Sequence, residues 1–545
     1  MQERNILVTS ALPYANGDIH LGHLGEYHQT DFWVRYQKMR GHQCIYICAD
    51  DTHGTPIMLK AKERNITPEE LIAESKVKHE KDFAGFQIEF DNFGSTNSEQ
   101  NREVCYEFYE KMKNNNLLKS REIEQNYCEH DKMFLPDRFV KGTCPKCKSE
   151  DQYGDSCDVC GSTYSSTDLE NKVCSICKNT PVLKKSEHIF FNLNEYRDFL
   201  STWVPSHTQV EIANKLKEWL SADLKDWDIS RDEPYFGFEF PDKPGKFFYV
   251  WVDAPIGYIA STLEWGKKMN IDSTVFWKPE SDTELYHFIG KDIVYFHTLF
   301  WPAMLKCAGY KTPDKIFVHG FLKINGEKMS KSKGTFILAR TFIDHLNSDY
   351  LRYYFASKLS SSIDDIDLNF SDFLGKVNSE FIGKITNLVS RGAQMLHKKL
   401  DGKTGTLDSE AIDLITSARN RAETVFSHYE NRDFNRVIAE VRDIADETNR
   451  YFDAAEPWNL VKVDKDKTLQ VLTTTINMFR IIAIYLKPVL PHYVQKVETL
   501  LQDEPYDFNS LNIAHENRPI HPYEHLATRI EQRQIDDIIK DSSGF

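Results

Sequence analysis

The sequence predicts an α/β protein built on a doubly wound parallel sheet, followed by an all-α domain. Three observations support this prediction. Strand-like and helix-like segments alternate near the N-terminus, a cysteine-rich stretch interrupts the alternation, and helical periodicity takes over beyond about residue 375. At 545 residues the chain is too long for one hydrophobic core. Roughly three or four domains are therefore expected.

The first elements have the pattern of one strand–helix–strand unit. An apolar strand is expected over residues 5–11, a turn over 15–18, a helix over about 21–39 and a second strand over 43–49. This spacing is typical of a Rossmann-type sheet, in which ligands bind beyond the carboxyl ends of the strands.

The later elements follow from the same criteria. The α/β pattern resumes near residue 227 after the cysteine-rich stretch, with strands predicted at 247–252 and 285–289. Helices are predicted at residues 411–426, 437–452 and 469–486. We expect these helices to pack as a bundle.

Composition restricts the class of protein. Hydrophobic residues make up 41% of the chain and charged residues 27%, which is typical of a soluble folded protein. We find no signal peptide and no uninterrupted apolar run long enough to span a bilayer, so we expect a cytoplasmic protein without a membrane partner. In that reducing compartment the 11 cysteines are thiols or metal ligands. The net charge of −15 disfavours a nucleic-acid partner unless a local basic face binds it.

The segment His20-Leu21-Gly22-His23 lies at the turn into the first predicted helix. Gly22 allows the backbone to approach a nucleotide, and the imidazoles of His20 and His23 can donate hydrogen bonds to phosphate oxygens. A helix N-terminus adds free N–H groups. Taken alone, the tetrapeptide fits a surface turn equally well.

A second segment, residues 328–334, contains three lysines after the turn Asn325-Gly326. Lysines on a mobile loop can close over a triphosphate and neutralise the leaving pyrophosphate. A solvated lysine loop is the commoner role of such a run. The two segments together, in this order and about three hundred residues apart, predict one ATP site.

These segments, His20–His23 and Lys328–Ser332, resemble the signature sequences of class I aminoacyl-tRNA synthetases. The resemblance is closest to methionyl-tRNA synthetases and extends over nearly the whole chain. The other segments that carry it are Ala11–Gly17, Cys48–Pro56, Tyr249–Tyr258 and Tyr286–Asp292 with its continuation to His297.

The resemblance implies an ATP-dependent methionine–tRNA ligase. Such an enzyme converts L-methionine and Mg²⁺·ATP to methionyl-adenylate and transfers the methionyl group to the 3′ end of tRNA(Met), initiator tRNA included. The implied catalytic residues are His20, His23, Lys328 and Lys331, and the implied ATP-binding residues are Gly22, His23, Glu26, Lys328, Ser330 and Lys331. The additional C-terminal dimerising domain of many members of this family is not visible, either because this branch lacks it or because the chain was cut, and we expect this 545-residue chain to be a monomer.

The same resemblance implies a methionine pocket, in which Asp51 holds the substrate ammonium. Aromatic residues suit a thioether, because sulfur is polarizable and gains from contact with rings, and Tyr258 or His297 could supply a weak polar contact. Without the resemblance, each aromatic would be read as core. The implied pocket consists of Leu12, Tyr14, Asp51, Trp251, Ala254, Pro255, Tyr258, Ile293 and His297.

The cysteine spacing predicts structural zinc. Two Cys-x2-Cys pairs, Cys144/Cys147 and Cys157/Cys160, are separated by nine residues, a strong tetrahedral pattern. A second site could join the pair Cys174 and Cys177 to Cys128 and either Asp131 or His130. The remaining cysteines are expected to be buried apolar residues: Cys44, Cys48, Cys105 and Cys307.

The helical region holds the candidate RNA contacts Asn387, Arg391 and Trp458. Unstacked bases bind to aromatic rings, although a lone tryptophan between helices is more often packing. The resemblance implies that these three residues meet the anticodon. The expected domains are a catalytic first half (1–118), a zinc-knuckle insertion (119–226), a catalytic second half (227–325), the lysine loop with a stem-contact region (326–380), an anticodon-binding domain (381–520) and a tail helix (521–545).

Three alternatives remain open at this stage. The first is a synthetase for another apolar amino acid. The second is a nucleotidylyltransferase, which would share the histidine segment but would not need the helical C-terminal third. The third is a non-catalytic RNA-binding zinc protein. A panel of amino acids in ATP–pyrophosphate exchange tests the first alternative, and absence of exchange activity would support the third.

Overall fold

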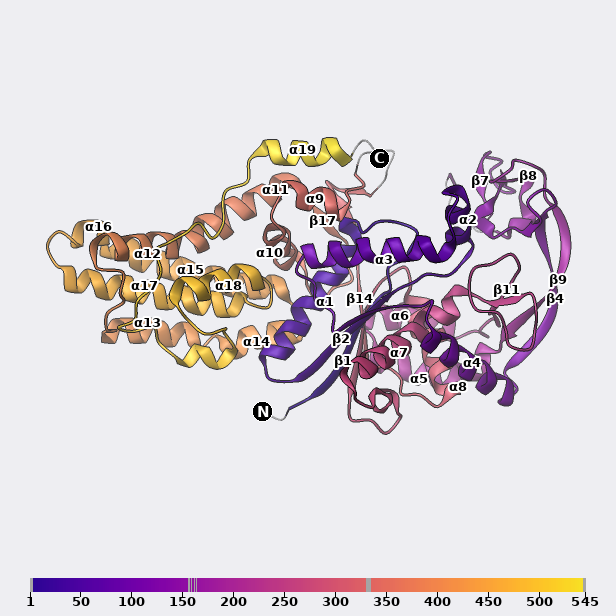
Figure 1. The fold of residues 1–545 in the computed structure, drawn as a ribbon, viewed down its shortest axis with the longest axis horizontal. Helices are drawn as coiled ribbons and strands as arrows, with labels where there is room; N and C mark the ends of the chain where they lie inside the picture. Colours follow the sequence, from indigo (N-terminus) through magenta and orange to yellow (C-terminus); the bar gives the residue numbers. More distant parts are fainter. Residues whose placement is uncertain are drawn as a thin grey trace.

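The N-terminal half is organised around a five-stranded parallel sheet (Figure 1), as the sequence predicts. The computed structural model describes residues 3–154, 157, 159–160, 162, 164–329 and 335–542. The strand order is β14-β13-β1-β2-β3, and every neighbouring pair is parallel. The strands are β1 (Asn5–Ser10), β2 (Gln43–Asp50), β3 (Asn92–Ser95), β13 (Glu284–Gly290) and β14 (Lys315–His319).

Helices cover both faces of this sheet because its central strand is apolar on both sides. In β1, Ile6 and Val8 join the core that contains α1, whereas Leu7 joins the core that contains α4, α7 and α8. Helix α1 spans the predicted residues 21–39. The helices of this part are α1 (Leu21–Met39), α2 (Thr55–Glu63), α3 (Pro68–Gly85), α4 (Glu99–Asn114), α7 (Val250–Met269) and α8 (Trp301–Ala308).

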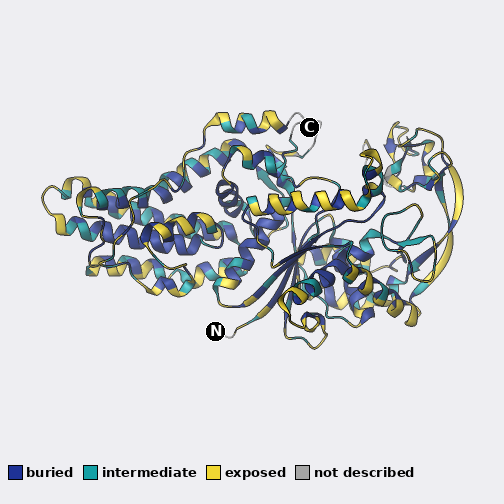
Figure 2. Cartoon of the chain, viewed as in Figure 1, coloured by how far each residue is buried: buried dark blue, intermediate teal, exposed yellow. Residues whose placement is uncertain are grey.

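The cysteine-rich insertion extends from the sheet on a long two-stranded ribbon. Strands β4 and β9 pair antiparallel over ten residues and are mostly exposed, as the yellow edge in Figure 2 shows. A small three-stranded sheet at the tip carries the cysteines and packs against Met58 of α2. The elements are β4 (Leu118–Cys128), β5 (Met133–Phe134), β6 (Val140–Thr143), β7 (Gln152–Tyr153), β8 (Glu170–Cys174), β9 (Val182–Phe191) and β10 (Trp227–Asp228). The helices between β9 and β10, α5 (Arg197–His207) and α6 (Val210–Leu220), pack instead in the core that contains Leu7.

The strand predicted over residues 247–252 is wrong. Strand β12 (Lys246–Phe248) pairs antiparallel with β11 (Ser230–Asp232) outside the main sheet, and α7 begins at Val250. Helix α7 is buried along most of its length, so its first apolar residues look like a buried strand in sequence.

The C-terminal part is the predicted helical bundle, joined to the sheet by a short mixed sheet. The predicted helices at 437–452 and 469–486 lie within α15 and α17, whereas the segment 411–426 is divided between two helices, α13 and α14. The elements are β15 (Leu322–Ile324), β16 (Glu327–Lys328), α9 (Ala339–His345), α10 (Ser348–Lys358), β17 (Ile366–Leu368), α11 (Phe370–Gly375), α12 (Asn387–Lys399), α13 (Ser409–Arg419), α14 (Ala422–Glu430), α15 (Phe434–Ala455), α16 (Pro457–Leu460), α17 (Lys465–Leu486), α18 (Pro491–Leu501) and α19 (Gln532–Ser542).

Helix α17 forms the centre of this bundle. Among the described residues, it is the one helix long and apolar enough to cross a membrane, with a mean hydropathy of 1.4 over its most apolar window. However, 89% of that window is buried inside the protein, which identifies α17 as a core helix. The C-terminal helix α19 returns along the bundle and packs on α9 (Figure 1).

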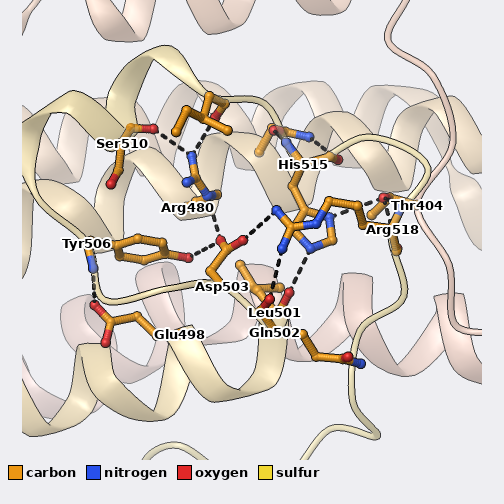
Figure 3. Close-up of polar contacts among 12 residues, drawn as sticks. Thr404, Arg480, Glu498, Leu501, Gln502, Asp503, Tyr506, Ser510, His515 and Arg518 are labelled. Carbon is orange, nitrogen blue, oxygen red and sulfur yellow. Dashed lines mark hydrogen bonds and ion pairs between the residues drawn. The ribbon is translucent and has the colours of Figure 1, made fainter.

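A buried polar network fastens the segment after α18 to α17 (Figure 3). Asp503 accepts hydrogen bonds from Arg480 at 2.7 Å and Tyr506 at 2.6 Å, and it pairs with Arg518 at 2.7 Å. The neighbouring His515 is fully buried and bonds the Leu501 carbonyl through Nε2 at 2.7 Å. These contacts satisfy polar groups that would otherwise be costly to bury.

Candidate active site and metal clusters

A large cleft opens at the carboxyl ends of the parallel strands, where a doubly wound sheet binds its ligands. Its volume is about 1310 Å³, and its walls include the residues after β1 and β2, the N-terminus of α1 and part of the insertion. Nine residues assigned from the sequence lie on its wall: Leu12, Tyr14, His20, Gly22, His23, Glu26, Asp51, Trp251 and Ile293.

The histidine segment lies beside the residues that flank the lysine segment. The Leu21 N–H donates to the Ile337 carbonyl at 3.0 Å, and the Ala339 N–H donates to Ile19 at 2.8 Å. A Cβ added to Gly22 would lie 2.9 Å from the His20 ring and 3.0 Å from the Met329 sulfur, so Gly22 packs closely against both side chains. The two segments therefore meet at the cleft. Ser330, Lys331 and the side chain of Lys328 lie outside the part of the chain that the structure describes.

The two imidazoles of the histidine segment stack on each other at the start of α1. Their ring centroids are 3.7 Å apart. His20 Nδ1 accepts from the Gly22 N–H at 3.1 Å, and His23 Nδ1 accepts from the His20 N–H at 3.3 Å. Burial lowers the pKa of His23 well below its usual value, and the nearby charges of His20 and His79 add to this effect. His23 is therefore neutral, with its hydrogen on Nε2.

Glu26 and His319 form a hydrogen-bonded pair on the cleft wall. The sequence analysis assigned Glu26 to the site but did not identify His319. Glu26 accepts from the Ala11 N–H at 2.6 Å and from His319 Nε2 at 2.9 Å. His319 Nδ1 lies 2.7 Å from the Gly320 carbonyl, which can only accept a hydrogen bond. Burial opposes the charge on His319, but its bond to Glu26 prevails and raises its pKa. The only signal for His319 in the sequence is its position at the end of β14.

Four residues of the expected methionine pocket lie behind the cleft wall. Ala254, Pro255, Tyr258 and His297 are buried and are not on the cleft surface. Trp251 lies on the cleft wall, with its ring stacked on Phe296 at 4.2 Å and 6.4 Å from the His297 ring.

Tyr258 and His297 form an uncharged hydrogen-bonded pair. The Tyr258 hydroxyl lies 2.8 Å from His297 Nε2, and His297 Nδ1 lies 3.1 Å from the Ile293 carbonyl. Because the carbonyl only accepts, Nδ1 carries the hydrogen and Nε2 accepts from Tyr258. Burial lowers the pKa of His297 to about 4, so the imidazole is neutral at pH 7.

Asp51 lies on the cleft wall with one carboxylate oxygen unpaired within the described part of the chain. Its Oδ1 is buried and has no hydrogen-bond partner among the described residues. Burial, followed by the charge of Asp253, raises the pKa of Asp51 well above its usual value. Asp253 itself is bonded to His53 at 2.7 Å. A cation in the cleft beside Asp51 would restore its charged form, because an opposite charge lowers a carboxyl pKa.

The four predicted zinc ligands form one compact cluster. Cys144 and Cys160 sulfurs are 3.9 Å apart, and those of Cys147 and Cys157 are 3.5 Å apart. All four ligand atoms lie within 4.8 Å of one another. Tetrahedral zinc with Zn–S bonds of about 2.3 Å requires sulfurs roughly 3.8 Å apart, so the cluster fits such an ion.

A second cluster contains Cys128, Asp131, Cys174 and Cys177. Asp131 Oδ2 lies 3.1 Å from the Cys128 sulfur and 3.3 Å from the Cys174 sulfur. His130 instead points outward, with 66% of its side chain exposed, and contacts the other Asp131 oxygen at 3.2 Å. Of the two residues left open by the sequence, Asp131 is the one inside the cluster.

Arg391 and Trp458 lie on the same part of the helical domain, and both are close to Phe452. The Arg391 guanidinium is 4.6 Å above the Phe452 ring, and the Trp458 ring is 6.1 Å from it. Trp458 is 43% exposed, so its ring is accessible. Asn387 is one helical turn before Arg391 on α12 and bonds the Gly383 carbonyl at 3.2 Å.

The parallel sheet, the two convergent segments, the cysteine insertion and the helical domain define a class I aminoacyl-tRNA synthetase. A family model described as tRNA synthetases class I (M) matches residues 6–393, and the anticodon binding domain of methionyl tRNA ligase matches residues 402–537. The chain therefore belongs to the methionyl-tRNA synthetase family, the methionine–tRNA ligases of class I.

Individual relatives agree with this assignment. The methionine–tRNA ligase of Bdellovibrio bacteriovorus is 58% identical over 540 residues, which is 99% of this chain and 78% of the relative. The Mycobacterium tuberculosis methionyl-tRNA synthetase bound by methionyl-adenylate shares the fold, with a TM-score of 0.79, 22% identity, and coverage of 96% of this chain and 100% of that chain. Its apo form gives a TM-score of 0.73 at 22% identity, covering 97% and 99% of the two chains.

Proposed function

We propose that this one cleft carries out both steps of methionine–tRNA ligation. In the first step, the methionine carboxylate attacks the α-phosphate of ATP, which gives methionyl-adenylate and pyrophosphate. In the second, the terminal ribose of tRNA(Met) takes the methionyl group. The observation that carries the proposal is the contact of Gly22 with Met329, which brings the histidine and lysine segments to the same cleft. The M. tuberculosis relative with the same fold is bound by methionyl-adenylate, which supports an adenylate here.

The nucleotide half of the cleft works by positioning and charge stabilisation. His20 and His23 donate hydrogen bonds to the α-phosphate as negative charge builds up on it. Gly22 allows the phosphate to approach the helix N-terminus, and Glu26 orients the nucleotide beside His319. The side chains of Lys328, Ser330 and Lys331 hold the leaving pyrophosphate, with Lys331 as the main cation. Mg²⁺ bound with ATP supplies further positive charge.

The amino-acid half recognises a cation and a thioether. Asp51 binds the methionine ammonium, and this positive charge favours the ionised form of the buried carboxyl group. Leu12, Tyr14, Trp251 and Ile293 form the near wall of the side-chain pocket, and Ala254, Pro255, Tyr258 and His297 form its depth. The uncharged Tyr258–His297 pair provides a weak polar contact suited to sulfur.

The remaining parts bind RNA and metal. Both cysteine clusters hold structural zinc, since four protein ligands leave no position for a reacting water. The insertion reaches the cleft wall and faces the acceptor end of tRNA, while Asn387, Arg391 and Trp458 meet the anticodon. The enzyme serves initiator and elongator tRNA(Met), acts in the cytoplasm as a monomer, and has the six-part domain division expected from the sequence.

Methionine-dependent ATP–pyrophosphate exchange tests the proposal. Methionine should support exchange far better than leucine, isoleucine or valine, and Lys331→Ala should lower the rate by orders of magnitude, because the pyrophosphate loses its main cation. Exchange with another amino acid but not with methionine would show that the enzyme activates that amino acid and would refute the proposed substrate. Exchange near the wild-type rate in Lys331→Ala would remove that lysine from the reaction.

A further inference from the structure

The turn ahead of His20 is held by side chains from two neighbouring helices. Three consecutive backbone carbonyls each accept a hydrogen bond. Ser75 Oγ of α3 donates to Ala15 at 2.9 Å, His79 Nε2 of α3 lies 2.7 Å from the Gly17 oxygen, and Lys60 of α2 donates to Asn16. Since this turn leads directly into His20, its position sets where the histidine segment begins.

His79 is the buried member of this group. Its Nδ1 lies 2.6 Å from Asp50 Oδ1, and the two side chains are 1% and 0% exposed. The Gly17 carbonyl can only accept, so Nε2 carries a hydrogen. Burial opposes a charge on His79, but the Asp50 hydrogen bond prevails and raises its pKa. His79 therefore links Asp50 at the end of β2 to the Gly17 carbonyl in the turn.

Asp82, one helical turn further along the same face of α3, holds the helix that follows the lysine segment. It accepts from Arg340 Nη2 at 2.7 Å and from Arg340 Nε at 3.1 Å. Arg340 lies in α9, which begins a few residues after the lysine segment. At the end of α3, Gly85 packs closely against Ile343 of α9, because an added Cβ would lie 2.5 Å from the Ile343 side chain. Helix α3 thus touches the flanks of both segments.

We propose that α3 is a brace that fixes the turn before the histidine segment and the start of α9, which follows the lysine segment, relative to each other, and that His79 and Asp82 are its positioning residues. Neither residue lines the cleft, so His79 acts through the Gly17 carbonyl and Asp82 through the Arg340 side chain. A buried pair is weak evidence for net stability once its desolvation is counted, and we infer that these pairs serve to fix position. The proposal rests on the assignment of both segments to ATP made above.

The brace predicts a specific kinetic defect. A misplacement of about 1 Å at a reacting group costs on the order of 10²-fold in rate. Loss of the His79–Gly17 bond should therefore lower kcat for ATP–pyrophosphate exchange by about 10- to 100-fold. The KM for methionine should change little, because the methionine contacts remain in place.

Two substitutions at one position test this prediction. In His79→Gln the amide nitrogen can take the place of Nε2 and donate to Gly17. In His79→Asn the shorter amide can reach Asp50 but not Gly17. We expect the kcat defect in His79→Asn and recovery of most of the rate in His79→Gln. Equal rates in the two variants would overturn the role of the Gly17 bond.

His515→Asn is the matched control for the loss of a buried histidine. His515 also bonds a backbone carbonyl through Nε2, but it lies in the helical domain (Figure 3). The His515→Asn substitution should lower the melting temperature without changing the rate of ATP–pyrophosphate exchange. If His79→Asn behaves in the same way, the brace is refuted. Arg340→Gln removes the ion pair with Asp82 at the other end of the brace. Because the Arg340 side chain is 34% exposed, this variant should still fold, and a lowered kcat in it tests the brace if His79→Asn does not fold. A wild-type chain without methionine-dependent exchange would instead refute the proposed function.

Discussion

Removing one hydroxyl from the methionine pocket separates recognition of sulfur from packing. Tyr258→Phe deletes only the oxygen that lies 2.8 Å from His297 Nε2. Both side chains are 2% exposed, so no solvent can replace the lost donor. A buried acceptor left without its partner costs about 1–3 kcal/mol, and the variant should lose that much unfolding free energy.

The effect on selectivity should be smaller. The hydroxyl has one hydrogen and can donate to the thioether only by turning away from His297. The contact with sulfur therefore contributes only the difference between the hydrogen bond from Tyr258 to the thioether and the one from Tyr258 to His297, about 1 kcal/mol. That energy corresponds to roughly a fivefold factor, since about 1.4 kcal/mol is tenfold. Norleucine, which has a methylene in place of sulfur, should lose correspondingly less activity than methionine.

The assay is ATP–pyrophosphate exchange with methionine and with norleucine, together with urea denaturation. We expect the ratio of kcat/KM for methionine over norleucine to fall about fivefold in Tyr258→Phe. An unchanged ratio combined with lower stability would show that Tyr258 only packs against His297. An unchanged ratio and unchanged stability would refute the hydrogen bond itself.

Three further predictions concern the metal, the RNA and pH. Asp131→Ala should lower the zinc content by one ion per chain in elemental analysis, while Asp131→Cys should retain it, and equal zinc in the two variants would exclude Asp131 as a ligand. Trp458→Ala should raise the KM for tRNA(Met) about tenfold through lost base stacking, with methionine activation unchanged, and an unchanged KM would place the ring in packing alone. The folded pKa of His297 is about 4, below the unfolded value of roughly 6.5, so the unfolded chain binds more protons between these values. The wild type should therefore lose unfolding free energy relative to His297→Gln as the pH falls from about 6.5 to about 4, and parallel pH curves in denaturant titrations would contradict this.

Local patterns made the nucleotide-binding unit and the first metal cluster predictable. The helix at 21–39 follows from a capped, periodic segment, and the Cys144–Cys160 cluster follows from ligand spacing alone. Such features depend on residues close together in the chain, where sequence spacing determines geometry. The order of the two segments added one long-range expectation, a single ATP site. The close approach of Gly22 and Met329 supports that prediction, which still awaits a test with ATP.

The sequence could not reveal pairings between distant residues. His319 meets Glu26 across 293 residues and Arg340 meets Asp82 across 258, and nothing local distinguishes these side chains from other surface charges. The sequence also could not reveal how deeply each pocket residue is buried, because nothing in it distinguishes a Tyr258 that lines the cleft from one that lies behind the cleft wall. The choice between His130 and Asp131 depends on which way one tight turn directs two adjacent side chains.

Asp82 and His79 show why a brace is difficult to detect in sequence. Their spacing on α3 is ordinary for a helix, and both would be assigned to a solvated face. Only the fold reveals that the partners of this face, Gly17 and Arg340, flank the two ATP-binding segments.

The most direct measurement is a crystal structure of the chain with methionine and a non-hydrolysable ATP analogue. We predict one nucleotide in the cleft, with its α-phosphate within hydrogen-bond distance of His20 and His23 and its terminal phosphates at Lys331. The methionine ammonium should lie against Asp51. A nucleotide that contacts only one of the two segments, or that binds outside this cleft, would contradict the account.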